Sequence, residues 1–179
     1  MELNAGDRVN ARTLTTIEGT DITIPAEAGL VHLQFRRFAG CPICTLHLRE
    51  VARRVDEITT AGVREVVVFH SAADALRRYQ ADLPFAVVAD PDRELYDEFG
   101  VGSSLRALLH PQVVRAARRG ARQMRSVRSV VGSLAPTENH LGKPADFLIG
   151  PDGVVRARKY GEHADDQWSV DELLQLAAR

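Results

Sequence analysis

The sequence predicts an α/β fold in which a central mixed β-sheet is flanked by helices. Short apolar runs that resemble buried strands alternate with amphipathic segments of helical spacing along the first half of the chain. This alternation is typical of parallel strands joined by helices. Near the C-terminus, "ADFLIGPDGVVRARKY" sets the turn sequence Pro-Asp-Gly between two strand-like runs, which predicts an antiparallel hairpin.

Length and composition argue for a globular protein. The chain of 179 residues can bury a core without a disulfide or a structural metal, and we expect a single domain over residues 1–179. Apolar residues make up 45%, charged residues 26%, and the formal net charge is −1, which argues against a disordered or nucleic-acid-coating protein. The sequence contains neither a secretion signal nor an apolar run long enough for a membrane span, so we expect a cytoplasmic location.

The first half of the chain divides into five predicted elements after an N-terminal hairpin. Threonine and isoleucine alternate around Glu18-Gly19, which predicts that hairpin in residues 8–26. The apolar run "LVHLQFRRF" is a strand that leads into an amphipathic helix with Pro42 at its first position, whose apolar stripe from Cys44 to Ile58 covers about four turns and which Gly62 closes. The segments that follow are predicted as strand, helix and strand: "VREVVVFHS", "AADALRRYQADL" and "PFAVVAD".

The second half contains a short helix, an insertion, the hairpin and a last helix. "PDRELYDEFGV" predicts a helix that ends at Gly100. Ser169 and Glu172 form a capping box at the start of the last helix, "WSVDELLQLAA".

Residues 103–136 interrupt the alternation, and we interpret them as a helical insertion within the domain. One side of this segment is rich in arginine: Arg106, Arg115, Arg118, Arg119, Arg122, Arg125 and Arg128. The simplest interpretation is a helix face exposed to solvent. More specific interpretations are that these arginines bind an acidic partner, form a dimer contact or bind an anionic surface. Nucleic acid is not expected, because the segment lacks aromatic side chains that could stack on bases.

Both cysteines lie where the first buried strand meets its helix, in "CPIC". Proline favours the first position of a helix, so Pro42 makes Cys41 the N-cap residue. The unpaired N–H groups and the helix dipole favour a thiolate there, and Arg36 and Arg37 are close enough in sequence to add to this effect. Cys41 is therefore the candidate nucleophile.

Cys44 lies one helical turn further on, towards the apolar stripe, and is the candidate resolving cysteine. Attack by Cys41 on a sulfur or on a peroxide oxygen would be followed by closure of a Cys41–Cys44 disulfide. A metal site would need two more ligands, and the histidines have no ligand-like spacing, so we expect no metal and no cofactor. The simplest alternative is that both cysteines are unreactive thiols of the core. This alternative would not explain why they lie at the start of a helix.

The sequence resembles the peroxiredoxin-like members of the alkyl hydroperoxide reductase/thiol-specific antioxidant (AhpC/TSA) family, in the thioredoxin-like superfamily. The resemblance rests on four features: "RRFAGCPIC" after a strand, "LPFAVVADPDRELYDEFGV", "KPADFLIGPDGVV" and the capped last helix. It covers most of the chain and implies a thioredoxin-like fold. It also implies that Lys143-Pro144 is a cis bond and that Pro144 docks substrate beside Cys41. Arg37 and Phe38 are the other expected substrate contacts.

The sequence departs from the family pattern at positions near the cysteines. Main-family peroxiredoxins have a Pro seven residues before the reactive cysteine and a Thr or Ser three residues before it. Here these positions are Gln34 and Phe38, so the hydroxyl that helps to hold peroxide is missing. The family's active-site Arg is replaced around Pro144, and Arg36 or Arg37 could approach from the other side.

Three further polar residues near these motifs have plain interpretations. We interpret His47 as a half-solvated histidine on the helix flank, rather than a proton shuttle for Cys44. His140 is expected to be a loop histidine rather than part of the site. Asp146, at the start of a strand, is expected to cap or to pair with a nearby arginine rather than to act in catalysis.

These observations predict an antioxidant thiol oxidoreductase that reduces peroxides through Cys41, resolved by Cys44. The alternatives are a general thiol-disulfide oxidoreductase and a non-enzymatic redox-sensing adaptor that binds a partner through its basic helix. The expected partners are a peroxide or disulfide substrate and an external thiol reductant such as a thioredoxin-type protein. No nucleic acid and no membrane is expected, and a homodimer is an open alternative to a monomer.

Overall fold

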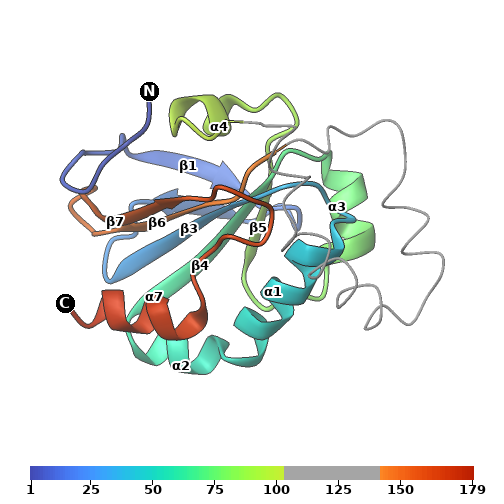
Figure 1. Cartoon of the computed structure of the whole chain (residues 1–179). Coiled ribbons are helices and arrows are strands. Elements are labelled where there is room, and N and C mark those ends of the chain that lie inside the picture. Colours follow the sequence, from blue (N-terminus) through green and yellow to red (C-terminus); the bar gives the residue numbers. More distant parts are fainter. Residues whose placement is uncertain (103–141) are drawn as a thin grey trace.

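The computed structural model describes residues 1–102 and 142–179 (Figure 1). The elements before the undescribed segment are β1 (Arg12–Thr15), β2 (Asp21–Ile24), β3 (Leu30–Arg36), α1 (Pro42–Arg53), α2 (Val55–Thr60), β4 (Val63–Phe69), α3 (Ala73–Gln80), β5 (Ala86–Ala89) and α4 (Glu94–Glu98). Those after it are β6 (Ala145–Ile149), β7 (Val155–Tyr160) and α7 (Val170–Ala177). The predicted helical insertion over residues 103–136, with its arginine-rich face, lies outside the described residues.

The central sheet is mixed, as the sequence predicts. Its strand order is β5-β4-β3-β6-β7, with β3, β4 and β5 parallel and with β6 and β7 antiparallel to their neighbours. The predicted N-terminal hairpin is also present as the pair β1–β2. Gly19 in its turn has a φ of +84°, a left-handed conformation that glycine adopts without steric cost.

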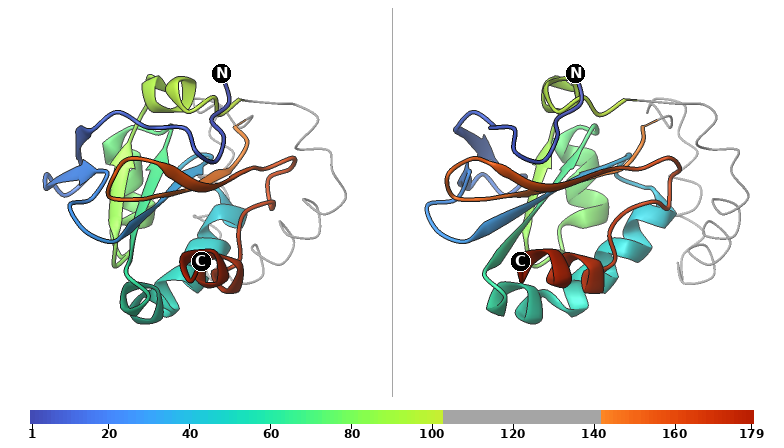
Figure 2. Two further views of the ribbon diagram at one scale, coloured as in Figure 1. Left: turned by 90° about the vertical axis from the view of Figure 1, so that its left-hand side faces the viewer. Right: turned by 60° about the vertical axis from the view of Figure 1, so that its left-hand side comes forward.

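Helices cover both faces of the sheet (Figures 1 and 2). One apolar cluster joins the face formed by Leu33, Phe35 and Phe147 to α4 and the N-terminal hairpin. Two clusters join the opposite face to α1, α2, α3 and α7; Phe69 with Leu48 and Leu148 with Leu173 are examples. None of the helices in the described part of the chain is long and apolar enough to span a bilayer.

The helix predicted from Pro42 to Gly62 is two helices, so this prediction is wrong in detail. Arg54 separates α1 from α2, with a φ of −113° and a ψ of 17°. Its N–H bonds to the carbonyl of Val51, three residues back, which interrupts the bonds between residues four apart. The short helix ending near Gly100 and the capping box of Ser169 and Glu172 are confirmed.

Strand β3 carries apolar side chains on one face and polar ones on the other. Leu33 and Phe35 belong to the apolar cluster under α4. His32, Gln34 and Arg36 alternate with them and are buried on the side of α1 and α7. The sheet register sets His32 beside Glu65 of β4 and Gln34 beside Asp146 of β6. The end of β3 therefore places buried charged side chains in the layer under α1. The cysteine motif follows directly after this strand.

Candidate active site

Cys41 is the N-cap residue of α1, as predicted. Its φ of −64° and ψ of 114° are extended, and Pro42 occupies the first helical position. The Cys41 Sγ accepts a hydrogen bond from the backbone N–H of Cys44 at 3.4 Å. One of the unpaired donors at the helix start is thus directed at the sulfur, which favours a thiolate.

The two cysteine sulfur atoms lie in direct contact. The Cys44 Sγ is 2.7 Å from the Cys41 Sγ and donates its hydrogen to it, and both residues are reduced. Cys41 is 0% exposed and Cys44 is 2% exposed. Both pack in an apolar cluster with Phe38, Ile43 and Leu48. The pair is placed so that a short movement can close a disulfide.

Arg37 is the arginine that reaches the sulfur. Its Nη1 donates to the Cys41 Sγ at 3.8 Å, and its guanidinium lies over the Phe38 ring with 5.4 Å between Cζ and the ring centroid. Arg36 instead pairs with Asp146 at 2.7 Å. Of the two arginines named from the sequence, only Arg37 contacts the sulfur. Substrate contacts by Arg37 and Phe38 stay a prediction.

The surroundings separate the pKa values of the two thiols. Burial raises the pKa of Cys41, but the hydrogen bond from Cys44, the charge of Arg37 and the backbone N–H groups of Cys44 and Ile43 lower it to about 7. Burial raises the pKa of Cys44, and its bond to Cys41 and the charge of that neighbour raise it further. Near neutral pH a large fraction of Cys41 is therefore thiolate, whereas Cys44 keeps its proton.

Two buried polar side chains hold the turn before Cys41, and the sequence analysis missed both. The Cys41 N–H bonds to the Phe38 carbonyl at 3.0 Å, which closes the turn. Within the turn, the N–H of Ala39 donates to the Ser71 Oγ at 2.9 Å, and its carbonyl accepts from the Gln80 Nε2 at 2.7 Å. The sequence offers little signal for either residue, since Gln80 is only one polar position within the predicted amphipathic segment "AADALRRYQADL".

The cis bond expected at Lys143-Pro144 is a wrong prediction. In the described residues the cis bond lies at Ile24-Pro25, and Lys143-Pro144 is trans. The trans form is the ordinary state of an X–Pro bond, and contacts on both sides accommodate it here. The Lys143 N–H bonds to the Gly102 carbonyl, and the Pro144 carbonyl accepts from the Gly161 N–H. Pro144 lines a pocket with Gly102 and Gly161 whose described lining includes neither cysteine, and docking of substrate by Pro144 stays a prediction that has lost its cis bond.

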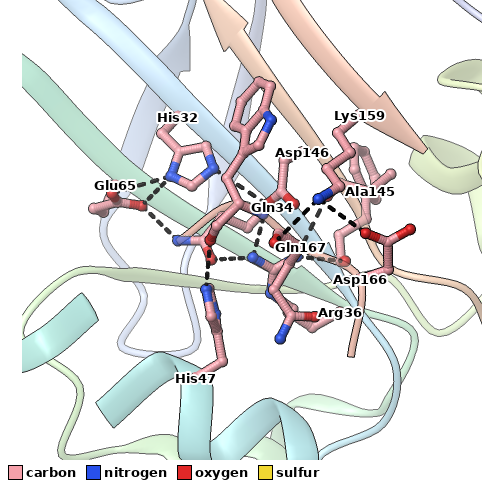
Figure 3. A network of polar contacts seen from close by, with 12 residues as sticks. His32, Gln34, Arg36, His47, Glu65, Ala145, Asp146, Lys159, Asp166 and Gln167 are labelled. Carbon is pink, nitrogen blue, oxygen red and sulfur yellow. Dashed lines mark hydrogen bonds and ion pairs between the residues drawn. The ribbon is translucent and has the colours of Figure 1, made fainter. Parts of the chain in front are cut away.

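A buried polar network extends from β3 between β4 and β6 (Figure 3). His32 Nδ1 lies 2.9 Å from a Glu65 carboxylate oxygen, and His32 Nε2 lies 3.2 Å from the Asp146 Oδ1. Arg36 also bonds to this Asp146 oxygen. Gln34 accepts from Arg36 and donates to Glu65, so the five side chains form a closed ring. The predicted pairing of Asp146 with an arginine is confirmed.

The network contains two positive and two negative side chains. Burial alone lowers the pKa of His32, but Glu65 and Asp146 raise it to about 9, so His32 is protonated at neutral pH. Burial raises the pKa of Asp146, while Arg36 and His32 hold it well below its usual range. The charges of His32 and Arg36 therefore balance those of Glu65 and Asp146, which buried charges require.

His47 links this network to α1, and it lies partly exposed on the flank of that helix, as the sequence predicts. Its side chain is half-buried, and its Nε2 donates to the Trp168 carbonyl at 2.8 Å (Figure 3). The Trp168 N–H in turn donates to Asp146. Burial and the charge of Arg36 lower the pKa of His47 to about 3, so it is neutral at neutral pH.

Within residues 1–102 and 142–179, no three His, Cys, Asp or Glu side chains are arranged to hold a metal ion. His140 lies outside the described residues, and its place in a loop stays a prediction.

Comparison with known families finds one match over most of the chain. The sequence profile of the AhpC/TSA family matches residues 5–158, which include both cysteines and strands β1 to β6. No curated protein matches the sequence.

Several solved structures share the fold. Peroxidoxin BcpB from Mycobacterium tuberculosis is similar with a TM-score of 0.70 and 16% identity, over 99% of this chain and 97% of that one. AhpC from the same organism has a TM-score of 0.68 and 16% identity, over 99% and 93% of the two chains. A putative thiol:disulfide interchange protein DsbE from Chlorobium tepidum has a TM-score of 0.61 and 18% identity, over 98% and 99%. These likenesses confirm the predicted thioredoxin-like fold.

Proposed function

This chain belongs to the AhpC/TSA family of thiol-dependent oxidoreductases, and from that premise we propose that it reduces peroxides through a Cys41 thiolate that Cys44 resolves. The contact between the two sulfur atoms carries this proposal. The Cys41 Sγ accepts hydrogen bonds from the Cys44 thiol and the Cys44 N–H, and Arg37 lies on it as well. The site thus combines a stabilised thiolate with a protonated thiol in bonding range.

The proposed reaction has three steps. The Cys41 thiolate attacks one peroxide oxygen and the O–O bond breaks, which leaves a sulfenic acid on Cys41 and an alcohol or water after protonation. Cys44 then loses its proton and its sulfur attacks the Cys41 sulfur; the S–O bond breaks, water leaves and a disulfide forms. An external dithiol reduces this disulfide and returns both thiols.

The burial of Cys41 favours a small oxidant. With 0% of the residue exposed, the sulfur can react with a molecule of the size of hydrogen peroxide after a small opening of the site. A protein disulfide would have to bring two sulfur atoms and their flanking chains to the same point. General thiol-disulfide exchange, the second candidate, is supported by the short Cys-Pro-Ile-Cys spacing. Because the Cys41 sulfur is buried, we favour peroxide reduction over thiol-disulfide exchange.

The proposed cycle also defines partners and a location. Regeneration of Cys41 and Cys44 needs a thiol reductant, for which a thioredoxin-type protein is the proposed donor, and it needs a reducing compartment such as the cytoplasm. A homodimer is proposed as an alternative assembly state. The redox-sensing adaptor was based on the arginine-rich segment, which lies outside the described residues, and that hypothesis stays a prediction.

Steady-state turnover tests the proposal. The purified protein is supplied with thioredoxin, thioredoxin reductase and NADPH, and the oxidation of NADPH is followed after addition of hydrogen peroxide. We expect turnover by the wild-type protein and none by Cys41→Ser. Turnover that survives in Cys41→Ser would overturn the assignment of the nucleophile. The same assay with an oxidised protein disulfide in place of peroxide tests the second candidate.

A further inference from the structure

Residues at both ends of helix α3 hydrogen-bond to the turn before Cys41. Ser71 lies two residues before the helix and Gln80 is its last residue, and both bond to the same residue, Ala39. Both side chains are 2% exposed, and Ala39 is 0% exposed. The backbone N–H and carbonyl of Ala39 therefore have no access to water, and these two side chains replace it as partners.

The position of Ala39 determines where the Cys41 sulfur lies. Ala39 is the second residue of the turn that the Cys41 N–H closes on Phe38. Arg37 and Phe38 precede it, and Cys41 follows two residues later. A turn that rotated at Ala39 would move the Cys41 sulfur relative to the N–H of Cys44 and to the Arg37 guanidinium, which both contact it now.

We propose that Gln80 and Ser71 are positioning residues for Cys41, which they hold through Ala39 against the first-turn N–H groups and Arg37. This inference rests on the proposed function of Cys41 as the nucleophile. Neither side chain acts on the sulfur itself; each fixes the peptide group whose orientation places the sulfur. The polar ends of Ser71 and Gln80 thus have a function beside the apolar cluster that contains Cys41, Ile43 and Leu76.

The test measures the pH midpoint of thiolate formation at Cys41 in the reduced protein. The thiolate is detected by its ultraviolet absorbance. We expect the wild-type midpoint near 7, because the Cys44 thiol, Arg37 and the first-turn N–H groups stabilise the Cys41 thiolate. In Gln80→Met, which keeps the length of the side chain but not its donor, we expect a higher midpoint. The thiolate fraction below the midpoint should fall about fivefold, the factor that one ordinary hydrogen bond is worth. Ser71→Ala should shift the midpoint in the same direction.

Two control variants separate positioning from general stability. Ser71→Thr keeps a hydroxyl for the Ala39 N–H and should retain the wild-type midpoint. Leu173→Ala removes a buried side chain of α7 and should lower overall stability without moving the midpoint. Midpoints that stay at the wild-type value in both Gln80→Met and Ser71→Ala would overturn the proposal, and so would an equal shift in Leu173→Ala.

The assay uses neither peroxide nor a thiol reductant. A wild-type protein that forms the Cys41 thiolate but does not reduce peroxide would refute the proposed function and leave the positioning inference intact. A wild-type protein that reduces peroxide, but whose pH midpoint does not change in Gln80→Met and Ser71→Ala, would refute the positioning inference alone.

Discussion

The thiol of Cys44 donates a hydrogen bond to the sulfur of Cys41 across 2.7 Å, in a site where both residues are buried. In the reduced protein this bond stabilises the Cys41 thiolate. After oxidation the same two atoms are the ones that must bond. One contact therefore serves both the activation of the nucleophile and its resolution, and it also assigns the two cysteines different roles.

Replacement of Cys44 by alanine should stop the reaction at the first oxidation step. We expect Cys44→Ala to react with one equivalent of hydrogen peroxide and to accumulate a sulfenic acid on Cys41, because the attacking thiol is gone. Trapping with dimedone and peptide mass spectrometry measures this product. Cys41→Ala should give no adduct. Turnover of Cys44→Ala with thioredoxin at the wild-type rate would contradict the resolving role.

Removal of the Arg37 charge should raise the pKa of Cys41. In Arg37→Met the burial of the sulfur remains while an opposing positive charge is lost, so we expect the reaction with peroxide at neutral pH to slow about tenfold. The difference should shrink at high pH, where both proteins have a thiolate. Stopped-flow kinetics between pH 6 and 10 measure both effects. Arg78→Met, on the exposed side of α3, is the matched control and should match wild type.

His32 should make the stability of the fold depend on pH in alkaline solution. Its pKa is raised to about 9 in the folded protein from an ordinary 6.5, so its contribution is full below pH 6.5 and is lost as the pH rises through about 9. We expect the wild-type advantage over His32→Gln in free energy of unfolding to shrink by about 3 kcal/mol across this window.

Urea denaturation of both proteins at several pH values measures this advantage. Cys41 acts in the opposite direction, since its lowered pKa gives a contribution that is present at high pH and lost as the pH falls through about 7. It is common to both proteins and cancels in the difference. A difference that stays constant from pH 6 to pH 10 would contradict the protonation assigned to His32.

Loss of the buried Asp146 carboxylate should destabilise the fold far more than loss of a surface carboxylate that also pairs with an arginine. Asp146→Asn leaves the buried Arg36 charge without its carboxylate and should lower the free energy of unfolding by about 3 kcal/mol or more. Asp171→Asn breaks the exposed pair with Arg54, which solvent screens, and should cost far less. Equal losses in the two variants would show that the buried network contributes little.

Features that depend on neighbouring residues in the chain could be predicted from the sequence. The capped position of Cys41 follows from Pro42 and the strand before it, and the capping box of Ser169 and Glu172 follows from their spacing. The mixed sheet follows from the order of apolar runs. In the two capping cases the residues that define the feature lie within a few positions of one another.

Features that depend on register between strands could not be predicted. The run from Leu30 to Phe38 appears apolar, although His32, Gln34 and Arg36 share one face at every second position. Their partners Glu65 and Asp146 come from two other strands, and only the sheet register brings them together. The contacts of Ala39 with Ser71 and Gln80 depend instead on how α3 packs against the turn before Cys41, and residues so far apart in the chain give no sequence signal for such packing.

The isomer of Lys143-Pro144 was inferred from resemblance alone. Contacts with Gly102 and Gly161, both distant in sequence or across the undescribed segment, surround this bond. A proline before a strand does not by itself determine its isomer.

The rate of thiol loss after mixing the reduced protein with stoichiometric hydrogen peroxide tests the central claim most directly. An unstructured peptide with one cysteine, at equal thiol concentration, is the reference. The proposed function predicts loss far faster than in the peptide, with both thiols consumed per peroxide and a Cys41–Cys44 disulfide as the product. A rate like that of the peptide would contradict peroxide activation by this site and would favour disulfide exchange.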